Sequence, residues 1–523
     1  MAGAVETDVG ARRDARAGAG GHVRRQLRKI TEQVLAERTL ILASNRGPIE
    51  YRRVGGTLRA KRGAGGVVTA VSAISGLANP IWIAAALGPG DRERAVQAGG
   101  RPIEETGGGN RYRLRFVTPD PAVYDAYYNV IANPLLWFLQ HYLWDTPRAP
   151  NIDRATHRAW DDGYAVVNRL FGEAVVDEAR RADQPALVLL QDYHLYLAPA
   201  TIRAALPDAL VQLFVHIPWP DADYWRVLTR RMCEAICRSL CACDIVGFQT
   251  QRSARSFLRT CESFLPDADV DYRTRTVHLG GQTTRARVYP ISIDVNAVRR
   301  TARSNAAREH GAHFDAQLHR PHQTILRVDR IEPSKNILRG FEAYRLLLED
   351  HPELRRQVRF LALLVPSRLG VEEYGRYLDE INVLVGRINL EFGSDEWQPI
   401  EIVTGDDYAR ALAALQRYDV LLVNPLIDGM NLVAKEGAVL NHRNGVIVLS
   451  EGAGAFEQLN HLTLPVWPCD ISGTADALYE ALMLPAEERH ERARNLRQVV
   501  EEGDIARWLY DQLVDLRQIS SGV

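Results

Sequence analysis

Short runs of apolar residues alternate with longer stretches of helical periodicity over most of this 523-residue chain. The short runs are rich in Val, Ile and Leu, as expected for strands that are buried on both faces. The stretches between them are long enough to form helices that cover such strands. The pattern therefore predicts an α/β fold, in which parallel sheets are wrapped by helices.

The predicted strands form two sets, separated by the helical and charged segment Ile293–His319, which we expect to contain a hinge. The first set comprises Thr39–Ser44, Ile81–Ala86, Ala186–Gln191, Leu210–His216, Asp244–Phe248 and Arg287–Pro290. The second comprises Thr324–Val328, Val358–Val365, Ile400–Val403, Val420–Asn424 and Gly445–Leu449. Because parallel sheets bind ligands at the carboxyl ends of their strands, two such domains predict a cleft between these ends.

These patterns divide the chain into an extension over residues 1–38, a first domain over 39–295 and a second domain over 296–499. A C-terminal helix within residues 500–523 is expected to rejoin the first domain. Its segment Ile505–Leu516 is amphipathic, with four apolar residues on one side, namely Trp508, Leu509, Leu513 and Leu516. In the extension, Met1–His22 is rich in Gly, Ala and Arg and predicts disorder, and Val23–Arg38 predicts a short basic helix.

Composition and charge narrow the class of partner. The net charge of −1 gives no electrostatic reason to expect nucleic acid or an acidic membrane surface. No apolar run approaches the roughly 20 residues that span a bilayer, and the N-terminus lacks the apolar segment of a secretory signal. We therefore expect a cytoplasmic enzyme that acts on small molecules; whether it forms a homo-oligomer is left open.

The cysteines favour the same compartment. Cys233, Cys237 and Cys241 recur at a spacing of four and form one stripe of a predicted helix, and Cys243 and Cys261 follow. The Cys-x2-Cys pairs of zinc sites are missing, so packing of free thiols is favoured over metal binding. No metal and no cofactor are expected.

Lysine is rare in this chain, since only four of the 64 basic residues are lysines. Lys335 and Lys435 lie in Val328–Lys335 and Asp428–Glu436, the two segments most suggestive of a nucleotide-sugar site. Arg330 and Lys335 follow the first strand of the second set. Two cations at this spacing could stabilise a departing diphosphate, and the alternative is a surface loop with ordinary ion pairs.

Asp428-Gly-Met-Asn-Leu follows a buried strand and opens a predicted helix. Such a strand, turn and helix present free backbone N–H groups and a positive dipole end, which suit a diphosphate. Asp428 is an anion and would therefore bind sugar hydroxyls, while Glu436 could accept hydrogen bonds from a ribose diol. The alternatives are a simple N-cap for Asp428 and a solvated helix residue for Glu436.

Polar residues also follow strands of the first set. Arg46 ends the first strand in Ser-Asn-Arg-Gly, and a glycine run that includes Gly65 and Gly66 precedes a predicted helix and could pass under a phosphate. His216 ends a strand in a rigid two-proline turn, and Asp192 stands at the equivalent edge of the preceding strand.

Aromatic residues gather in one segment of the first domain, which contains Tyr127, Tyr128 and Trp137. Stacking on a sugar and ordinary core packing are both open for them. The chain shows no paired carboxylates of a glycosidase, no Gly-x-Ser-x-Gly, no Walker A loop and no dinucleotide fingerprint. These absences point away from hydrolysis and phosphoryl transfer, and towards a reaction driven by a good leaving group.

Taken together, these motifs resemble the trehalose-6-phosphate synthase family of retaining glycosyltransferases, over about Leu40 to Leu516. The motifs that carry the resemblance are Ser44-Asn45-Arg46, Gly65-Gly66, Tyr127-Tyr128-Asn129 with Trp137, Asp192–Leu195, His216–Pro218, Arg330–Lys335, Pro366-Ser367-Arg368, Gly386–Asn389 and Asp428–Glu436. The resemblance implies the glycosyltransferase-B fold, with two Rossmann-like parallel-sheet domains facing across a cleft.

The resemblance also implies roles for individual residues. Catalysis would involve Arg330, Lys335, His216 and Asp428. The donor would be held by Gly65, Gly66, Arg330, Lys335, Asp428, Gly429, Met430, Asn431, Leu432 and Glu436. A sugar-phosphate acceptor would be held by Arg46, Tyr128, Trp137, Asp192 and Arg368. The implied reaction is metal-independent transfer of glucose, with retention, from a nucleoside-diphosphate glucose to glucose 6-phosphate, which gives α,α-trehalose 6-phosphate.

Several positions depart from the family pattern and leave the identity of the acceptor open. Gln191 stands where the family usually has His, Trp219 replaces Phe, Asn336 replaces Gly and Ile427 replaces Arg. The stretch Pro218–Arg226 and the Lys-Asn pair are more similar to validoxylamine-7′-phosphate synthases, which couple a nucleotide-cyclitol to an aminocyclitol phosphate. Glucosylglycerol-phosphate synthesis is a further alternative, and a catalytically silent sugar-phosphate sensor is an alternative of another class.

Overall fold

The computed structural model describes residues 21–62, 79–107, 110–317, 323–367 and 372–521. Residue contacts divide the chain into two compact units. The first unit takes in the chain up to Ile291 and again from Ile505 onward, and the second is Ser292–Asp504. The described residues leave out residues 1–20 of the predicted disordered segment Met1–His22, the glycine run with Gly65 and Gly66, and Arg368. The last two residues of the predicted disordered segment, Gly21 and His22, begin a helix instead.

The first unit is built on a ten-stranded sheet in the order β10-β11-β12-β9-β8-β7-β1-β4-β6-β5. Its parallel centre consists of β1 (Thr39–Ser44), β4 (Ile81–Ala85), β7 (Ala186–Gln191), β8 (Leu210–Phe214) and β9 (Ile245–Phe248). Every residue of β4, β7, β8 and β9 is buried, as the apolar runs predict. The remaining strands are β5 (Ile103–Gly107), β6 (Asn110–Val117), β10 (Asp269–Asp271), β11 (Thr276–Leu279) and β12 (Gln282–Val288).

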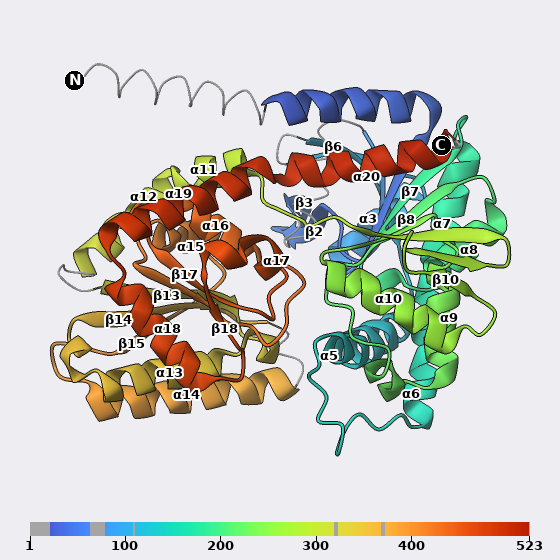
Figure 1. The fold of residues 1–523 in the computed structure, drawn as a ribbon. Coiled ribbons are helices and arrows are strands. Elements are labelled where there is room, and N and C mark those ends of the chain that lie inside the picture. The colour runs from blue at the N-terminus through green and yellow to red at the C-terminus, as the bar shows by residue number, and fades with distance from the viewer. Residues whose placement is uncertain (1–20, 63–78, 108–109, 318–322, 368–371, 522–523) are drawn as a thin grey trace. The chain divides into compact units, whose positions relative to one another are not determined.

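The second unit is built on a parallel six-stranded sheet in the order β15-β14-β13-β16-β17-β18. Its strands are β13 (Gln323–Arg330), β14 (Val358–Val365), β15 (Ile400–Thr404), β16 (Val420–Val423), β17 (Val446–Ser450) and β18 (Leu464–Val466). Figure 1 shows α13 (Ile337–Asp350), α14 (Glu372–Phe392) and α18 (Ile471–Met483) on one face. The other face carries α11 (Val295–Ala302), α12 (Asn305–Gln317), α15 (Tyr408–Leu415), α16 (Leu432–Leu440) and α19 (Ala486–Glu502).

Each sheet has one point at which the strand order reverses. In the first unit the chain runs outward from β1 through β4 and β6, and then from β7 through β8 and β9 on the other side. In the second unit it runs from β13 through β14 and β15, and then from β16 through β17 and β18. Open parallel sheets bind ligands at such switch points. The positions that follow β1 and β7, and those that follow β13 and β16, are therefore the expected binding edges.

The strands that the sequence pattern misses lie at the rims of the structure. β2 (Ile49–Val54) and β3 (Thr57–Arg62) form a separate hairpin that turns at Gly55 and Gly56, both with positive φ. The predicted strand Arg287–Pro290 is instead the end of β12, whose earlier residues are polar and half-buried. Half-buried antiparallel strands carry polar residues on one face, so an apolar run is a poor detector of them.

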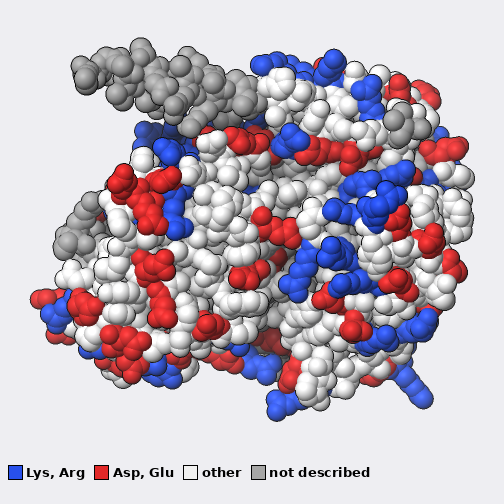
Figure 2. Space-filling view, viewed as in Figure 1, with Lys and Arg blue, Asp and Glu red and all other residues white. Residues whose placement is uncertain are grey.

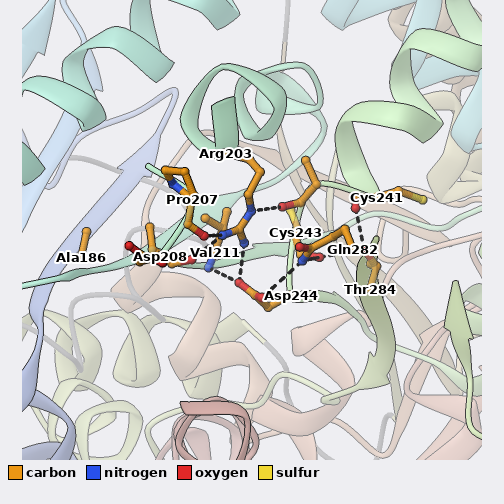
Figure 3. Close-up of polar contacts among 12 residues, drawn as sticks. Ala186, Arg203, Pro207, Asp208, Val211, Cys241, Cys243, Asp244, Gln282 and Thr284 are labelled. Carbon is orange, nitrogen blue, oxygen red and sulfur yellow. Dashed lines mark hydrogen bonds and ion pairs between the residues drawn. The ribbon is translucent and has the colours of Figure 1, made fainter. Parts of the chain in front are cut away.

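The amino ends of β8 and β9 are held by a half-buried polar cluster (Figure 3). Arg203, from α8 (Ala198–Ala205), donates to the carbonyl oxygens of Pro207 and Ala209 at 2.6 and 2.8 Å and to the Asp244 carboxylate at 2.7 Å. Asp244 also accepts from the backbone N–H of Val211 at 2.8 Å. These bonds fix where both strands begin, and thereby where their carboxyl ends come.

Two helices from the ends of the described chain lie side by side on the first unit (Figure 1). The helix over residues 21–37 buries Leu27, Ile30 and Val34, and α20 (Ile505–Ser520) buries Trp508, Leu509, Leu513 and Leu516. Arg517 of α20 donates to Gln33 at 2.6 Å, which joins the two helices. Within the described residues, no helix has both the length and the apolar character that a membrane crossing needs.

Candidate active site

In the second unit, the loops that follow β13 and β16 bring Lys335 and Asp428 together. The Lys335 Nζ lies 2.5 Å from the Asp428 Oδ2, and the two side chains are only 11% and 16% exposed. Asn431 donates to the same oxygen at 3.2 Å. The simple N-cap alternative for Asp428 is wrong, because Asn431 caps α16 by accepting from the backbone N–H of Ala434.

The surroundings of Lys335 keep its ammonium charged. Burial by itself lowers the pKa of Lys335, but the carboxylates of Asp428 and Asp329 outweigh burial and leave the pKa raised. Burial also raises the pKa of Asp329 to about 6, against the opposing charges of Arg327 and Lys335. A charged ammonium at the switch point of this sheet is suited to a phosphate.

Arg330 ends β13 and rests on a fully buried carboxylate. Its Nη1 lies 2.8 Å from the Glu332 Oε1, and the Arg330 side chain remains 47% exposed. Glu332 also accepts from the Ser367 hydroxyl at 3.1 Å. Arg330 therefore does form an ion pair, as the alternative of a surface loop predicts. The ion pair anchors the guanidinium at the edge of the sheet and leaves about half of the side chain exposed.

The loop that contains Asp428 is hydrogen-bonded through its backbone to the loop that follows β17. Asp428 donates its N–H to the Gly452 carbonyl at 2.9 Å and accepts from the N–H of Gly454 at 3.0 Å. A Cβ at Gly454 would stand 1.9 Å from the Gly429 carbonyl oxygen, so only glycine allows this approach. Sequence analysis missed this support, although Gly-Ala-Gly after a predicted strand was a signal for it.

Helices α13 and α16 both begin at an asparagine with left-handed backbone. Asn336 has φ 57° and ψ 40°, and Asn431 has φ 73°. The Asn336 amide donates to the carbonyl oxygens of Asn424 at 3.0 Å and Pro468 at 2.6 Å. Asparagine and glycine are the residues that tolerate this conformation. Asn336 in place of Gly therefore still allows the left-handed backbone that this position requires. Its side chain binds backbone atoms of the same protein.

Glu436 and Lys435 follow on α16. Tyr408 donates to the Glu436 Oε1 at 2.7 Å, a partner that sequence analysis missed. Burial raises the pKa of Glu436 to about 7, and the Tyr408 hydroxyl opposes the shift. Lys435 is buried and donates to Gln458 at 2.7 Å, and burial lowers its pKa to about 7.

In the first unit, the ends of β7 and β8 hold His216. Its backbone N–H donates to the Asp192 Oδ1 at 3.0 Å, and its Nε2 lies 2.9 Å from the Gln191 Oε1. Burial lowers the pKa of His216 to about 3, so the ring is neutral. Asp192 has φ 74° and ψ 173°, a region that is essentially confined to glycine and is typical of functional sites when another residue occupies it.

The remaining acceptor candidates lie around the end of β1. The Arg46 side chain is exposed directly after the buried Asn45, whose Oδ1 accepts from the hydroxyls of Tyr124 and Tyr127, both at 3.2 Å. Half-buried Tyr128 stacks against Tyr124, with ring centroids 5.6 Å apart and planes inclined by 12°.

Trp137 is packed more deeply than Tyr128. It is only 6% exposed, and its ring stacks on His141 at a centroid distance of 4.0 Å. Packing therefore accounts for most of the Trp137 surface. Tyr128 is half-buried and also stacks against His194, with ring centroids 5.9 Å apart.

The structure thus assembles two groups, one in each unit. The first group lies at the ends of the adjacent strands β1, β7 and β8 and consists of Arg46, Asp192 and His216. The second lies at the ends of the adjacent strands β13 and β16 and consists of Arg330, Lys335 and Asp428. Each group lies at the switch point of its sheet. Gly65, Gly66 and Arg368 lie outside the described residues and join neither group here.

Charge and metal-ligating residues add two observations. On the face shown in Figure 2, basic and acidic side chains are interspersed. Within the described parts of the chain, no group of three or more His, Cys, Asp or Glu side chains is arranged to hold a metal ion. The thiols of the predicted stripe, Cys233, Cys237 and Cys241, are free and buried.

Comparison with known proteins matches most of the chain to one family. The sequence profile described as glycosyltransferase family 20 matches residues 38–518. A validamine 7-phosphate valienyltransferase of Streptomyces hygroscopicus subsp. jinggangensis is 30% identical over 91% of this chain and 93% of its own length. A trehalose-6-phosphate synthase of Mycobacterium marinum is 33% identical over 96% and 98%.

A solved structure gives the same indication. It is an α,α-trehalose-phosphate synthase (UDP-forming) from Burkholderia xenovorans in complex with glucose-6-phosphate. It superposes with a TM-score of 0.77 at 28% sequence identity, over 92% of this chain and all of that one. The resemblance noted in the sequence, and the α/β fold with two parallel sheets, are thereby confirmed.

Proposed function

Because this chain belongs to glycosyltransferase family 20, we propose that it transfers glucose, with retention, from a nucleoside-diphosphate glucose to glucose 6-phosphate, forming α,α-trehalose 6-phosphate. The observation that carries the proposal is the group formed by Arg330, Lys335 and Asp428 at the switch point of the second sheet. Two cations and a carboxylate there meet the needs of a diphosphate and a sugar. Relatives named for trehalose 6-phosphate synthesis support the choice of reaction.

The leaving group determines what the donor side must do. The bond between C1 of glucose and the diphosphate oxygen breaks, and its electron pair stays on the diphosphate. Lys335 and Arg330 would stabilise this charge, which develops in the transition state and is therefore where preorganised cations are most effective. Asp428 would accept from glucose hydroxyls, and Glu436 from the ribose diol.

The acceptor side completes the transfer. An oxygen of glucose 6-phosphate bonds to C1 on the face from which the diphosphate departs, and its proton passes to a phosphate oxygen of the leaving group. Because the leaving group accepts the proton, the reaction needs no carboxylate base. This agrees with the absence from the sequence of the paired carboxylates of a glycosidase. Arg46 and Tyr128 would contact the acceptor, Asp192 would accept from its hydroxyls, and His216 would lie near the reacting centre.

Four of the residues that are given roles lie outside the described parts of the chain or deep in packing. The donor roles of Gly65 and Gly66 and the acceptor role of Arg368 remain proposals from the family resemblance alone. The acceptor role of Trp137 likewise remains a proposal from the family resemblance, because the side chain is 6% exposed and stacked on His141. The six free thiols support a reducing compartment such as the cytoplasm.

The test is release of nucleoside diphosphate from UDP-, GDP- and ADP-glucose, with and without glucose 6-phosphate. We expect release that requires glucose 6-phosphate and yields a non-reducing disaccharide phosphate, with the α configuration at both anomeric carbons. The effective donor identifies the base. Turnover without glucose 6-phosphate, or binding of sugar phosphate without any turnover, would refute the assignment, and the second result would favour a silent sensor.

Valienyl transfer to validamine 7-phosphate is a second candidate, because one relative at 30% identity has that name. Two of the departures that resemble such enzymes are structural, however. Asn336 satisfies the left-handed start of α13. Trp219 is 2% exposed, donates to Thr260 at 3.0 Å and packs on Trp225. Validamine 7-phosphate therefore belongs in the acceptor panel, and we expect glucose 6-phosphate to be the better acceptor.

A further inference from the structure

Gln191 and His216 are in contact where the adjacent strands β7 and β8 end. Gln191 is the last residue of β7 and is 3% exposed, and its Oε1 lies 2.9 Å from the His216 Nε2. A carbonyl oxygen can only accept a hydrogen bond. The imidazole must therefore carry its proton on Nε2, which leaves Nδ1 with a lone pair.

The remaining contacts of His216 fix the residue without changing its charge. From β7, Asp192 is the titratable group in contact, and it binds the backbone N–H at 3.0 Å and not the ring. From β8, Phe214 meets the ring edge to face at 4.7 Å, and from α20 Trp508 lies 6.3 Å away. The last residue of β7 and the residue after it thus hold the ring and the backbone of one histidine. Burial lowers the pKa of this ring to about 3.

We propose that Gln191 is a positioning residue for glucosyl transfer: its carbonyl keeps His216 in the Nε2–H tautomer, so that Nδ1 serves only as an acceptor for a substrate hydroxyl. The inference rests on the proposed function for its kinetic consequence, but not for the tautomer. An imidazole at position 191 could donate or accept according to its own tautomer and charge. An amide carbonyl does not titrate, so it holds one arrangement at every working pH.

The test compares Gln191→Leu and Gln191→Glu with a matched control, Gln212→Leu. Gln212 is also a buried glutamine of the first sheet, but it donates to Gln512 of α20 at 2.5 Å. Leucine at 191 keeps the volume and removes the acceptor. We expect kcat to fall about 10²-fold, the size of effect that a positioned polar group has, with the donor KM within about threefold. The control should lose thermal stability, but it should not show a large fall in kcat at a nearly constant donor KM.

Glutamate at 191 keeps an acceptor and adds a negative charge. The charge favours the imidazolium and raises the pKa of His216. Protonation fills the Nδ1 lone pair, so kcat should fall as the pH decreases, and this acidic limb should be absent from the wild-type profile. An identical pH profile in both proteins would contradict the proposal.

The direct readout is the nitrogen spectrum of 15N-histidine-labelled protein, with the His216 signals assigned by a His216→Gln variant. We expect the wild type to show the neutral Nε2–H form and Gln191→Leu to show a mixture. A proton on Nδ1 in the wild type would overturn the proposal, as would a Gln191→Leu variant that behaves like the control in kinetics. If no donor is turned over, the proposed function fails, and the spectrum still decides whether Gln191 sets the tautomer.

Discussion

At the scale of single residues, Lys335 combines a structural contact with the role proposed for it in transfer. Its ammonium lies 2.5 Å from Asp428, so the buried charge is paired. In the proposed reaction the lysine would bind the diphosphate and the aspartate would bind the sugar. Asp428 is therefore the partner that keeps the lysine both charged and in place.

We predict that Lys335→Ala lowers kcat by about 10²–10³-fold, because it removes a cation from the developing diphosphate charge. Lys335→Arg should recover only part of this loss, since a planar guanidinium does not occupy the space of an ammonium. Exposed Lys29 offers the matched control. Nucleoside diphosphate release and the circular dichroism spectrum measure the effect, and full turnover in Lys335→Ala would refute the role of the lysine.

Glu436 predicts a dependence of stability on pH. Its pKa is raised from 4.5 to about 7 by burial. Between these values the folded protein holds a proton that the unfolded chain releases, so stability falls as the pH rises through this window. Glu436→Gln removes the titration. We therefore expect its Tm, relative to wild type, to be higher by a few degrees at pH 8 than at pH 5.

Thermal melts at the two pH values test this expectation. The exposed Glu396 supplies the control, since Glu396→Gln changes the same group without burial. An equal offset from wild type at both pH values in Glu436→Gln would show that Glu436 does not titrate in this range.

The residues of the site differ in whether the sequence pattern could indicate their partners. Lys335 and Asp428 were predictable because each follows a buried strand, and adjacent parallel strands end at one edge. Tyr408 and Gln458 were not, because they reach α16 from separate helices whose approach depends on tertiary packing. The strain at Asp192 was also invisible, since an aspartate in sequence carries no sign of its φ.

At the scale of elements, the junction between β7 and the short helix after it is a turn with a strained backbone. Asp192 adopts φ 74° and ψ 173° and lies between a hydrogen bond to the Phe214 carbonyl at 2.8 Å and one from the His216 N–H. A non-glycine residue in this region costs about 1–3 kcal/mol. The bond to Phe214 is made by the backbone of Asp192, and the carboxylate contributes the bond to the N–H of His216.

We predict that Asp192→Ala and Asp192→Gly both lose acceptor binding, but that they differ in stability. Alanine keeps the backbone strain and loses the bond to His216. Glycine relieves the strain, at the smaller cost of about 0.5–1 kcal/mol in backbone entropy. The glycine variant should therefore unfold at a higher denaturant concentration than the alanine variant, and the reverse order would show that the turn is unstrained.

The elements themselves were predictable in proportion to their burial. β7, β14 and β16 appear in the sequence as continuous apolar runs because both of their faces are covered. β2, β3 and β10 do not, because charged and polar residues occupy their exposed positions. Asn336 and Asn431 mark helix starts only once their left-handed backbone is known.

At the scale of the whole molecule, each unit has a core of its own, and α20 belongs to the core of the first. Trp508 is 3% exposed and meets Phe214 of β8 edge to face at 5.3 Å, and Gln512 binds Gln212 of the same strand. Phe341 is fully buried in the second unit beside Phe360. Each core can therefore be weakened by a single substitution.

We predict that Trp508→Ala and Phe341→Ala weaken different units, each by about 3–5 kcal/mol, the usual effect of removing a buried aromatic side chain. Scanning calorimetry with and without UDP separates them, because a ligand stabilises the unit that binds it. UDP should still raise the transition of the second unit in Trp508→Ala. A loss of this shift in Trp508→Ala, with its retention in Phe341→Ala, would contradict the assignment of α20 to the first unit.

The return of α20 also has a consequence for synthesis. A ribosome delivers β8 long before Trp508, because all of Ser292–Asp504 must be translated between the first unit and its last helix. Domains usually fold as units while the nascent chain emerges. Here the second unit is continuous and can fold as soon as it emerges, whereas the first must wait with the apolar face around Phe214 uncovered. The part of the protein that is made first is therefore the part that is finished last, and during translation it is the natural client for a chaperone.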